Sequence, residues 1–150
     1  MRLKGYDYAS QNYYFITVCS HNMSCIFGKP DNLNLYGRIA KEQLLRITNH
    51  FPDVRIDKYV IMQNHIHAII VIGCNGETER SRPFPTLSTI MGLYKSGVTK
   101  CIHKFDKNIT VWQKSYYENV IRNADSYSQI VRYIKENPIK WELDKYYNCN

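Results

Sequence analysis

Residues 59–73 read YVIMQNHIHAIIVIG, an almost wholly apolar stretch with one polar interruption at residues 63–67. Its β-branched residues and its closing glycine predict a buried strand. Because side chains alternate along a strand, His65 and His67 lie on one face, roughly 6–7 Å apart along the backbone. The opposite face carries four core residues, Ile66, Ala68, Ile70 and Ile72. Two imidazoles at this spacing can bind one divalent metal ion, although two hydrogen-bonded histidines at a strand end are the alternative.

The composition indicates one globular domain spanning residues 1–150. This length allows a substantial buried core, and 44% hydrophobic and 22% charged residues are ordinary for a globular protein. The formal net charge of +7 favours a polyanionic partner, most simply nucleic acid. Thirteen tyrosines beside basic residues suit stacking on unpaired bases, although we expect more than half of them to be packing residues.

The cysteines and the start of the chain indicate a cytoplasmic protein. An odd number of cysteines without a C-x-x-C pair argues against a disulfide framework and against a structural zinc site. These cysteines are Cys19, Cys25, Cys74, Cys101 and Cys149. Residues 1–5 show no signal peptide. No apolar run approaches about 18 residues, so neither a membrane span nor a membrane partner is expected.

Hydrophobic periodicity and breaking residues divide the chain into short elements. We expect strands at residues 13–19, 54–62, 64–73 and 109–121, and helices at residues 35–49, 87–104 and 124–136. Residues 21–34 and 74–86 contain the proline, glycine and asparagine typical of loops. The polar residues Gln63 and Asn64 favour a tight antiparallel hairpin, with a single bent strand as the alternative. Asn123 is suited to cap the last helix.

The predicted order of elements is β-α-β-β-α-β followed by one further helix. Four strands with two crossover helices form the ferredoxin-like layout, an α+β sandwich with a four-stranded antiparallel sheet. Helices 35–49 and 87–104 would cover one face of that sheet. The other face stays open for a functional site or for the C-terminal helix.

The C-terminal helix offers further polar groups to the histidine pair if it packs on the open sheet face. Tyr133 and Asn137 lie one turn apart on the same side of that helix. The phenol of Tyr133 could then point toward the histidines, and the amide oxygen of Asn137 could be a third ligand. Such a set would hold a divalent cation with open positions for water or phosphate. This arrangement is one of several, because three other tyrosines compete for the role: Tyr116, Tyr117 and Tyr127.

The helix at residues 87–104 has a basic face. Its apolar positions form one stripe, and its other face carries Lys95, Lys100 and Lys104. This face could bind a run of phosphates, and a merely solvated lysine face is the equal alternative.

Five stretches spread over nearly the whole chain carry a resemblance to a known family. They are Gly5–Tyr8, His65–His67 after Asn64, Leu87–Ile90 with Lys95–Ser96, Trp112–Gln113 and Tyr133–Pro138. In this order they closely resemble the REP-associated tyrosine transposases, a subfamily of the single-tyrosine HUH-type transposases. The chain departs from the family at Gln63, where relatives usually have proline. That difference alters the turn before the histidines but removes no ligand.

The resemblance implies a metal-dependent nuclease and strand transferase for single-stranded DNA. It assigns the nucleophile to Tyr133, on the extra C-terminal helix, and the third metal ligand to Asn137, beside His65 and His67. The phenol would attack the scissile phosphorus, form a 5′-phosphotyrosine link and release a 3′-hydroxyl, which conserves the phosphodiester energy for rejoining. The expected ion is Mg²⁺ or Mn²⁺, which would polarise a phosphate oxygen.

The resemblance also implies a substrate made of a DNA hairpin with a flanking single strand. DNA contacts are expected from the basic helix, from the loop at residues 74–86 and from the N-terminal arm. The residues concerned are Lys95, Lys100, Lys104, Arg80, Arg82, Tyr6 and Tyr8. Both a monomer and a homodimer are compatible with the family. The alternatives are a non-cleaving hairpin-DNA-binding or RNA-binding regulator of the same fold, an RNA-recognition module, and a metal-dependent hydrolase that uses water.

Overall fold

The structure is a computed structural model that describes residues 11–73 and 84–140. Its main strands are β1 (Gln11–Cys19), β4 (Val54–Ile61), β5 (His65–Gly73) and β6 (Tyr117–Ile121). Its helices are α1 (Leu35–Leu45), α2 (Ile47–His50), α3 (Leu87–Ile102) and α4 (Ala124–Glu136), with a short 3₁₀ turn η1 (His21–Met23). A small ribbon pairs β2 (Gly28–Lys29) with β3 (Asn32–Leu33).

The four main strands form one antiparallel sheet in the order β4-β5-β1-β6. Taken in sequence order, the first and third strands are central and the second and fourth are at the edges, which is the ferredoxin-like arrangement. The α+β fold class predicted from the sequence is therefore confirmed. β4 and β5 form a tight hairpin, in which the Met62 amide donates to the His65 carbonyl at 2.8 Å. The bent-strand alternative is therefore wrong.

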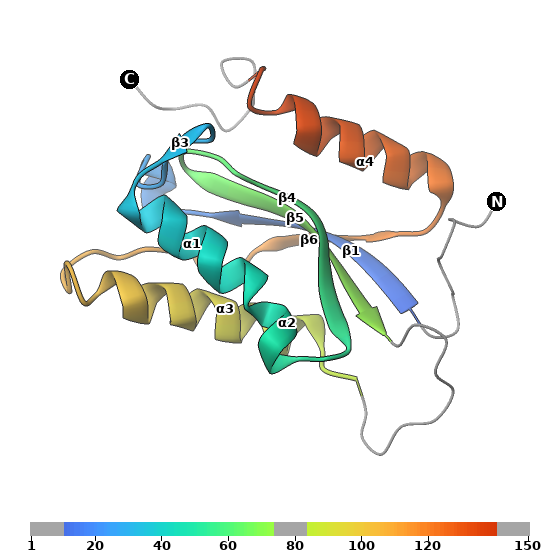
Figure 1. Ribbon diagram of the computed structural model, residues 1–150, viewed down its shortest axis with the longest axis horizontal. Helices are drawn as coiled ribbons and strands as arrows, with labels where there is room; N and C mark the ends of the chain where they lie inside the picture. Colours follow the sequence, from blue (N-terminus) through green and yellow to red (C-terminus); the bar gives the residue numbers. More distant parts are fainter. Residues whose placement is uncertain (1–10, 74–83, 141–150) are drawn as a thin grey trace.

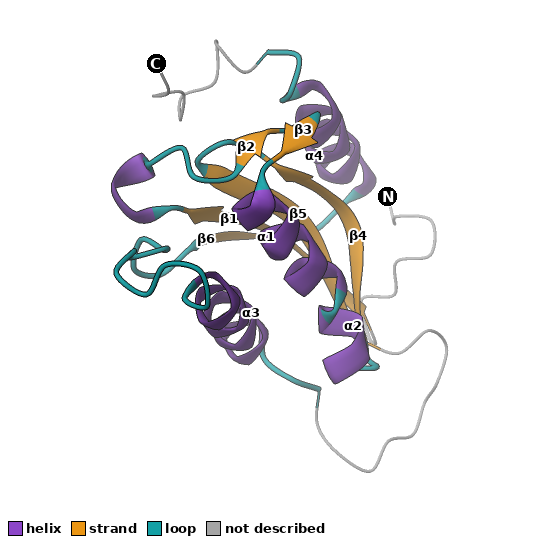
Figure 2. Cartoon of the chain, turned by 60° about the vertical axis from the view of Figure 1, so that its left-hand side comes forward, coloured by secondary structure: helices purple, strands orange, loops and turns teal. Residues whose placement is uncertain are grey.

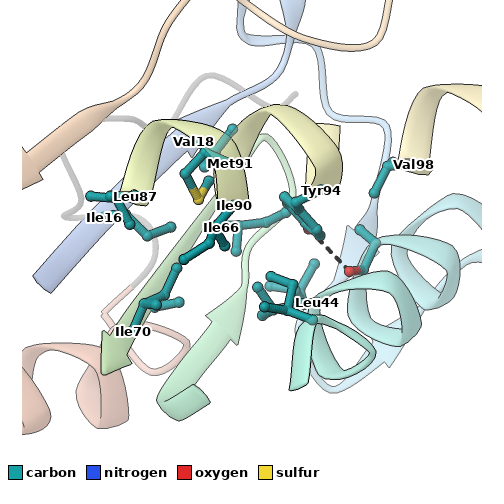
Figure 3. Close-up of a cluster of buried hydrophobic side chains, with 14 of the residues drawn as sticks. Ile16, Val18, Leu44, Ile66, Ile70, Leu87, Ile90, Met91, Tyr94 and Val98 are labelled. Carbon is teal, nitrogen blue, oxygen red and sulfur yellow. Dashed lines mark hydrogen bonds between the residues drawn. The ribbon is translucent and has the colours of Figure 1, made fainter. Parts of the chain in front are cut away.

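One face of the sheet is covered by α1 and α3, which lie below it in Figure 1. The side chains on this face of β5 are the four predicted core residues, and all of them are buried: Ile66, Ala68, Ile70 and Ile72. α3 buries six side chains against them, and Figure 3 shows Ile90, Met91 and Tyr94 in this cluster. The Tyr94 hydroxyl donates to the Ala40 carbonyl at 3.0 Å, which joins α3 to α1.

Among the described elements, α4 is the one that covers the other face of the sheet, as Figures 1 and 2 both show. α4 begins at Asn123, whose side chain accepts a hydrogen bond from the Ser126 amide at 2.8 Å, as predicted. A smaller core lies beneath α4, and its buried members are Tyr13, Ile69, Val71, Ile121 and Ile134. The second face is therefore the one on which His65 and His67 lie.

Several element boundaries differ from the prediction. The expected helix 35–49 divides at Arg46, which ends α1 and precedes α2, with its backbone in the right-handed helical region (φ −81°, ψ −6°). The expected strand 109–121 is regular only in β6, because Ser115 has a φ of 66° that interrupts an extended chain. The β2–β3 ribbon lies within the expected loop 21–34.

Two of the described cysteines, the buried Cys19 and the half-buried Cys101, are not in disulfide bonds. Cys25 is disulfide-bonded, which differs from the expectation. The odd cysteine count excludes complete pairing but does not exclude a single pair, so that part of the prediction was too broad. Among residues 11–73 and 84–140, no helix has the length and apolarity needed to cross a membrane.

Candidate active site

The candidate site is built on the first three residues of β5. His65 and His67 are 0% and 2% exposed, and their side chains point to the α4 face because they alternate with core residues. Their ring centroids are 4.6 Å apart at an interplanar angle of 72°. The two imidazoles are therefore adjacent and can act on one centre.

The orientation of His65 is set by Asn64. Nδ1 of His65 lies 2.7 Å from Oδ1 of Asn64, and Nδ2 of Asn64 donates to the Met23 carbonyl at 3.4 Å. Since a carbonyl only accepts, the bond to Met23 fixes which end of the amide faces His65. Oδ1 can only accept as well, so the His65 proton resides on Nδ1. In a neutral ring with this tautomer, the lone pair is on Nε2, which is buried.

His67 is held by residues of β1, the strand next to β5 in the sheet. Nδ1 of His67 lies 2.9 Å from the hydroxyl of the buried Thr17, its cross-strand partner. Phe15 stacks on the same imidazole, with ring centroids 5.3 Å apart and planes at 28°. Both histidines thus use Nδ1 for protein contacts, which directs the buried Nε2 atoms toward the site.

The turn before the histidines is fixed by the loop that follows β1. The Asn64 carbonyl accepts from both the amide (3.0 Å) and the hydroxyl (3.1 Å) of the buried Ser20. The Gln63 carbonyl accepts from the Phe27 amide at 3.1 Å. These bonds hold the turn at Gln63 and Asn64, so the histidines keep a defined position.

Tyr133 from α4 lies directly beside this pair. Its ring centroid is 5.1 Å from that of His67 and 6.3 Å from that of Phe15. The side chain is 40% exposed, so an incoming molecule can reach it. The structure thus brings together the predicted nucleophile and the predicted metal ligands, from residues 66 positions apart in the sequence.

Asn137 follows Tyr133 by one helical turn, and its backbone amide donates to the Tyr133 carbonyl at 3.0 Å. α4 runs from the Tyr13 end of the sheet toward the His65 end, so Asn137 lies beyond Tyr133 in the direction of His65. The side chain is 4% exposed, and its Nδ2 atom is buried with no hydrogen bond to the described residues. The two ends of a carboxamide are nearly the same size. A rotation of the amide by a half-turn would present Oδ1 at the same point, ready to bind a cation.

The donor set fits a divalent cation. It consists of two imidazole nitrogens and one amide oxygen, which suit manganese or magnesium with further positions filled by water or phosphate. In the described part of the chain, no third histidine, cysteine or acidic side chain joins the pair. The remaining ligands would therefore come from solvent or from a substrate, as an open site requires.

A polar network fastens α4 to the edge strand β4. The Tyr127 hydroxyl donates to Asp57, and Arg55 bonds both Asp57 (3.0 Å) and the Tyr13 hydroxyl (2.9 Å). Burial raises the pKa of Tyr127 well above its ordinary value, and the hydrogen bond to Asp57 raises it further. Tyr127 therefore stays protonated, and this rival tyrosine is engaged in holding the helix that carries Tyr133.

The basic face predicted on α3 lies in the layer opposite α4. Lys100 and Lys104 are exposed, beside a groove of 820 Å³ that contains Lys95 and Trp112. Lys95 donates to the carbonyls of Gln113 (3.0 Å) and Ser115 (2.8 Å), and partial burial lowers its pKa. Lys95 is thus engaged in holding the segment before β6. The other predicted DNA contacts, Arg80, Arg82, Tyr6 and Tyr8, lie outside the described residues.

Two residues of the site were missed at the level of sequence, Thr17 and Asn64. The sequence places Asn64 in the turn and directly before a stretch that carries the resemblance, and it places Thr17 in a strand, but it assigns neither a contact with the histidines. The available signal was their polarity in otherwise apolar segments, because a buried polar side chain needs a partner. Register was needed to identify those partners.

Comparisons with known proteins identify a sequence relative and solved structures of the same fold. No family model matches the sequence. A protein of Haemophilus influenzae, described as uncharacterized, is 42% identical over 164 aligned residues, which cover 98% of this chain and 91% of the relative.

Two solved structures share the fold. A REP-associated tyrosine transposase bound to a REP hairpin superimposes with a TM-score of 0.65 at 20% identity, over 97% of this chain and 77% of that one. A "putative transposase" of Deinococcus radiodurans has a TM-score of 0.56 at 12% identity, over 91% of this chain and 96% of that one. The chain therefore belongs to the family of the Haemophilus influenzae protein, and its fold is that of the REP-associated tyrosine transposases.

Proposed function

We propose that this protein is a transposase-type nuclease that cleaves and rejoins single-stranded DNA through Tyr133. The observation that carries the proposal is the contact between the Tyr133 ring and the His67 ring, beside a second buried histidine. A phenol next to two imidazole donors is the combination needed for attack on a phosphate group bound at a metal centre. The shared fold of a hairpin-bound transposase supports the same proposal.

The proposed reaction conserves atoms and charge. The Tyr133 oxygen forms a bond to the scissile phosphorus, and the bond from phosphorus to the 3′-oxygen of the preceding nucleotide breaks. The phenol proton is lost and the departing oxygen gains one, so the products are a 5′-phosphotyrosine and a free 3′-hydroxyl. Attack by another 3′-hydroxyl reverses the step and joins two ends without ATP.

The protein's own residues prepare the site for this step. Asn64 and Thr17 hold the imidazoles, and the three donors His65, His67 and Asn137 would bind Mg²⁺ or Mn²⁺. The bound ion would supply positive charge to a non-bridging phosphate oxygen and would favour loss of the phenol proton. The contact with Phe15 restricts the orientations of the Tyr133 ring, so less conformational freedom has to be lost when the phenol takes its attacking position.

We further propose that the substrate is a DNA hairpin with a single-stranded flank. The net charge of +7 suits a polyanion, and the solved transposase relative is bound to a REP hairpin. Binding should therefore weaken steeply with salt and should prefer hairpin over linear duplex. Because one chain contains the whole set of site residues, a monomer is sufficient for cleavage.

The test is incubation with hairpin DNA and Mn²⁺, followed by mass spectrometry of the peptide that contains Tyr133. The wild-type protein should form a covalent adduct on Tyr133, and Tyr133→Phe should form none while keeping its melting temperature and its DNA affinity. Tyr116→Phe, at a rival tyrosine, should still form the adduct.

Two results would contradict the proposal, and each favours a different alternative. Cleavage that persists in Tyr133→Phe would indicate a hydrolase that uses water. Hairpin binding without any cleavage by the wild-type protein would indicate a binding regulator.

A further inference from the structure

The edge strand β6 places an aromatic side chain in line with the histidine pair. Tyr117 pairs with Thr17 on β1, and Thr17 pairs with His67 on β5. Directly paired residues of antiparallel strands point to the same side, so Tyr117 shares the sheet face of His67. With about 4.8 Å between neighbouring strands, the two backbones lie roughly 10 Å apart.

Tyr117 is open to solvent, whereas the neighbouring aromatic residues are packed. Its side chain is 57% exposed, and it belongs to neither hydrophobic core of the described residues. Tyr116 packs against the large core, and Phe15 packs against the core beneath α4. In the part of the chain that the structure describes, the ring of Tyr117 is not packed into a core, so its flat surface is available for stacking.

The charges around β6 favour a nucleic acid strand as the stacking partner. Glu118 pairs with Ile16 and points to the opposite face, so the α4 face of β6 presents the neutral residues Tyr117, Asn119 and Ile121. The segment before β6 carries one exposed lysine, Lys114. An anionic backbone can therefore approach the ring without meeting an acidic side chain of β6.

We propose that Tyr117 is a stacking platform for an unpaired nucleobase next to the phosphate that Tyr133 attacks. This inference rests on the proposed function and adds a residue that positions the strand. Every base has a flat face, so stacking tolerates different sequences and fixes position more than identity. A base held at Tyr117 would align the following phosphodiester with the histidine pair.

The test uses a hairpin DNA whose single-stranded flank contains 2-aminopurine, a fluorescent base that is quenched by stacking. It is performed in the Tyr133→Phe background, so that binding is measured without cleavage. At one flank position, the 2-aminopurine fluorescence should be quenched both by the protein that has Tyr117 and by the Tyr117→Phe variant, because phenylalanine keeps the aromatic ring. Tyr117→Ala should remove the quenching and weaken binding roughly 5- to 150-fold.

The matched control is Phe105→Ala, because Phe105 is a 62% exposed aromatic residue that follows α3. It should change neither quenching nor affinity. Unchanged quenching in Tyr117→Ala, or equal losses in Tyr117→Ala and Tyr117→Phe, would overturn the inference. Failure of the proposed function is a separate result, since it would appear as a missing adduct in protein with Tyr133 while the stacking measurement still reads out.

Discussion

The two faces of β5 differ in almost every physical property although they alternate residue by residue. Toward α1 and α3, four aliphatic side chains join a large core to which α3 alone contributes six buried residues. Toward α4, two histidines precede Ile69 and Val71, and α4 buries one residue, Ile134. β5 thus borders two different layers. The thick apolar layer is the one formed with α1 and α3, and the thin layer, which contains polar groups, is the one formed with α4.

The difference explains how the protein supports a polar site within a small domain. Burial of apolar area is the main source of stability, and the α1–α3 layer supplies most of it. The α4 layer can then include buried imidazoles and amides, which are costly unless they have partners. Besides its small apolar core, α4 is held by the Asp57–Tyr127 bond and by ring contacts at Tyr13 and His67. The site thus lies in the layer that has fewer buried apolar side chains.

The sharpest test of this difference uses the neighbouring residues His67 and Ile66. His67→Ala should lower metal-dependent cleavage by more than about 100-fold, since a ligand should matter at least as much as its outer partners. Its melting temperature should change little, because it removes a polar group from the thin layer. Ile66→Ala should instead lower the free energy of unfolding by about 2–5 kcal/mol through a cavity in the thick layer.

Urea unfolding and cleavage of hairpin DNA, measured for both variants, would check this contrast. Cleavage by folded Ile66→Ala protein should stay close to the wild-type rate at a temperature where it remains native. Equal losses of stability in the two variants would show that the two faces are not divided in this way.

A smaller effect is expected at Asn64, which orients His65 without being one of its proposed co-ligands. Asn64→Ala removes the acceptor of the Nδ1 proton and should weaken Mn²⁺ binding about 10- to 100-fold, measured by calorimetry. Asn64→Asp keeps an oxygen acceptor for the Nδ1 proton, now as a carboxylate, and should retain most of the Mn²⁺ affinity.

Asn108→Ala, at an exposed asparagine before β6, is the control and should bind Mn²⁺ as the wild type does. If Asn64→Ala loses stability but keeps its Mn²⁺ affinity, Asn64 is a structural residue of the turn and does not set the His65 orientation.

The strands that carry the thick layer could be predicted from the sequence because their patterns are local. The apolar run after Asn64, the hairpin at Gln63 and the cap at Asn123 are short-range signals, and the structure has all three. The proximity of Tyr133 to the histidines also followed, once α4 was placed on the free face.

The parts that could not be predicted depend on long-range contacts. The bond from Thr17 to His67 requires the register of β1 against β5, which a single sequence does not encode in any local pattern. Lys95 looked like a surface cation on a helix, yet its ammonium group binds two carbonyls of a loop that follows 18 residues later. Because of that loop, the strand predicted at residues 109–121 is reduced to β6.

The smallest expected effect separates the two layers by their tyrosines at alkaline pH. Tyr94 lies in the thick layer and Tyr127 in the thin one, and burial raises the pKa of both. A tyrosine with a raised pKa in the folded state binds its proton more strongly than in the unfolded chain, so its stabilisation is complete below about pH 10 and is lost above it. The free energy of unfolding should therefore fall as the pH rises from about 9 to 11, by at most about 1.4 kcal/mol per pH unit for each such group.

Tyr94→Phe should flatten this decline clearly in urea titrations, whereas Tyr127→Phe should flatten it less, because Tyr127 is partly exposed and solvent screens its bond to Asp57. A larger flattening in Tyr127→Phe would mean that the α4 layer contributes more to global stability than its thin packing implies.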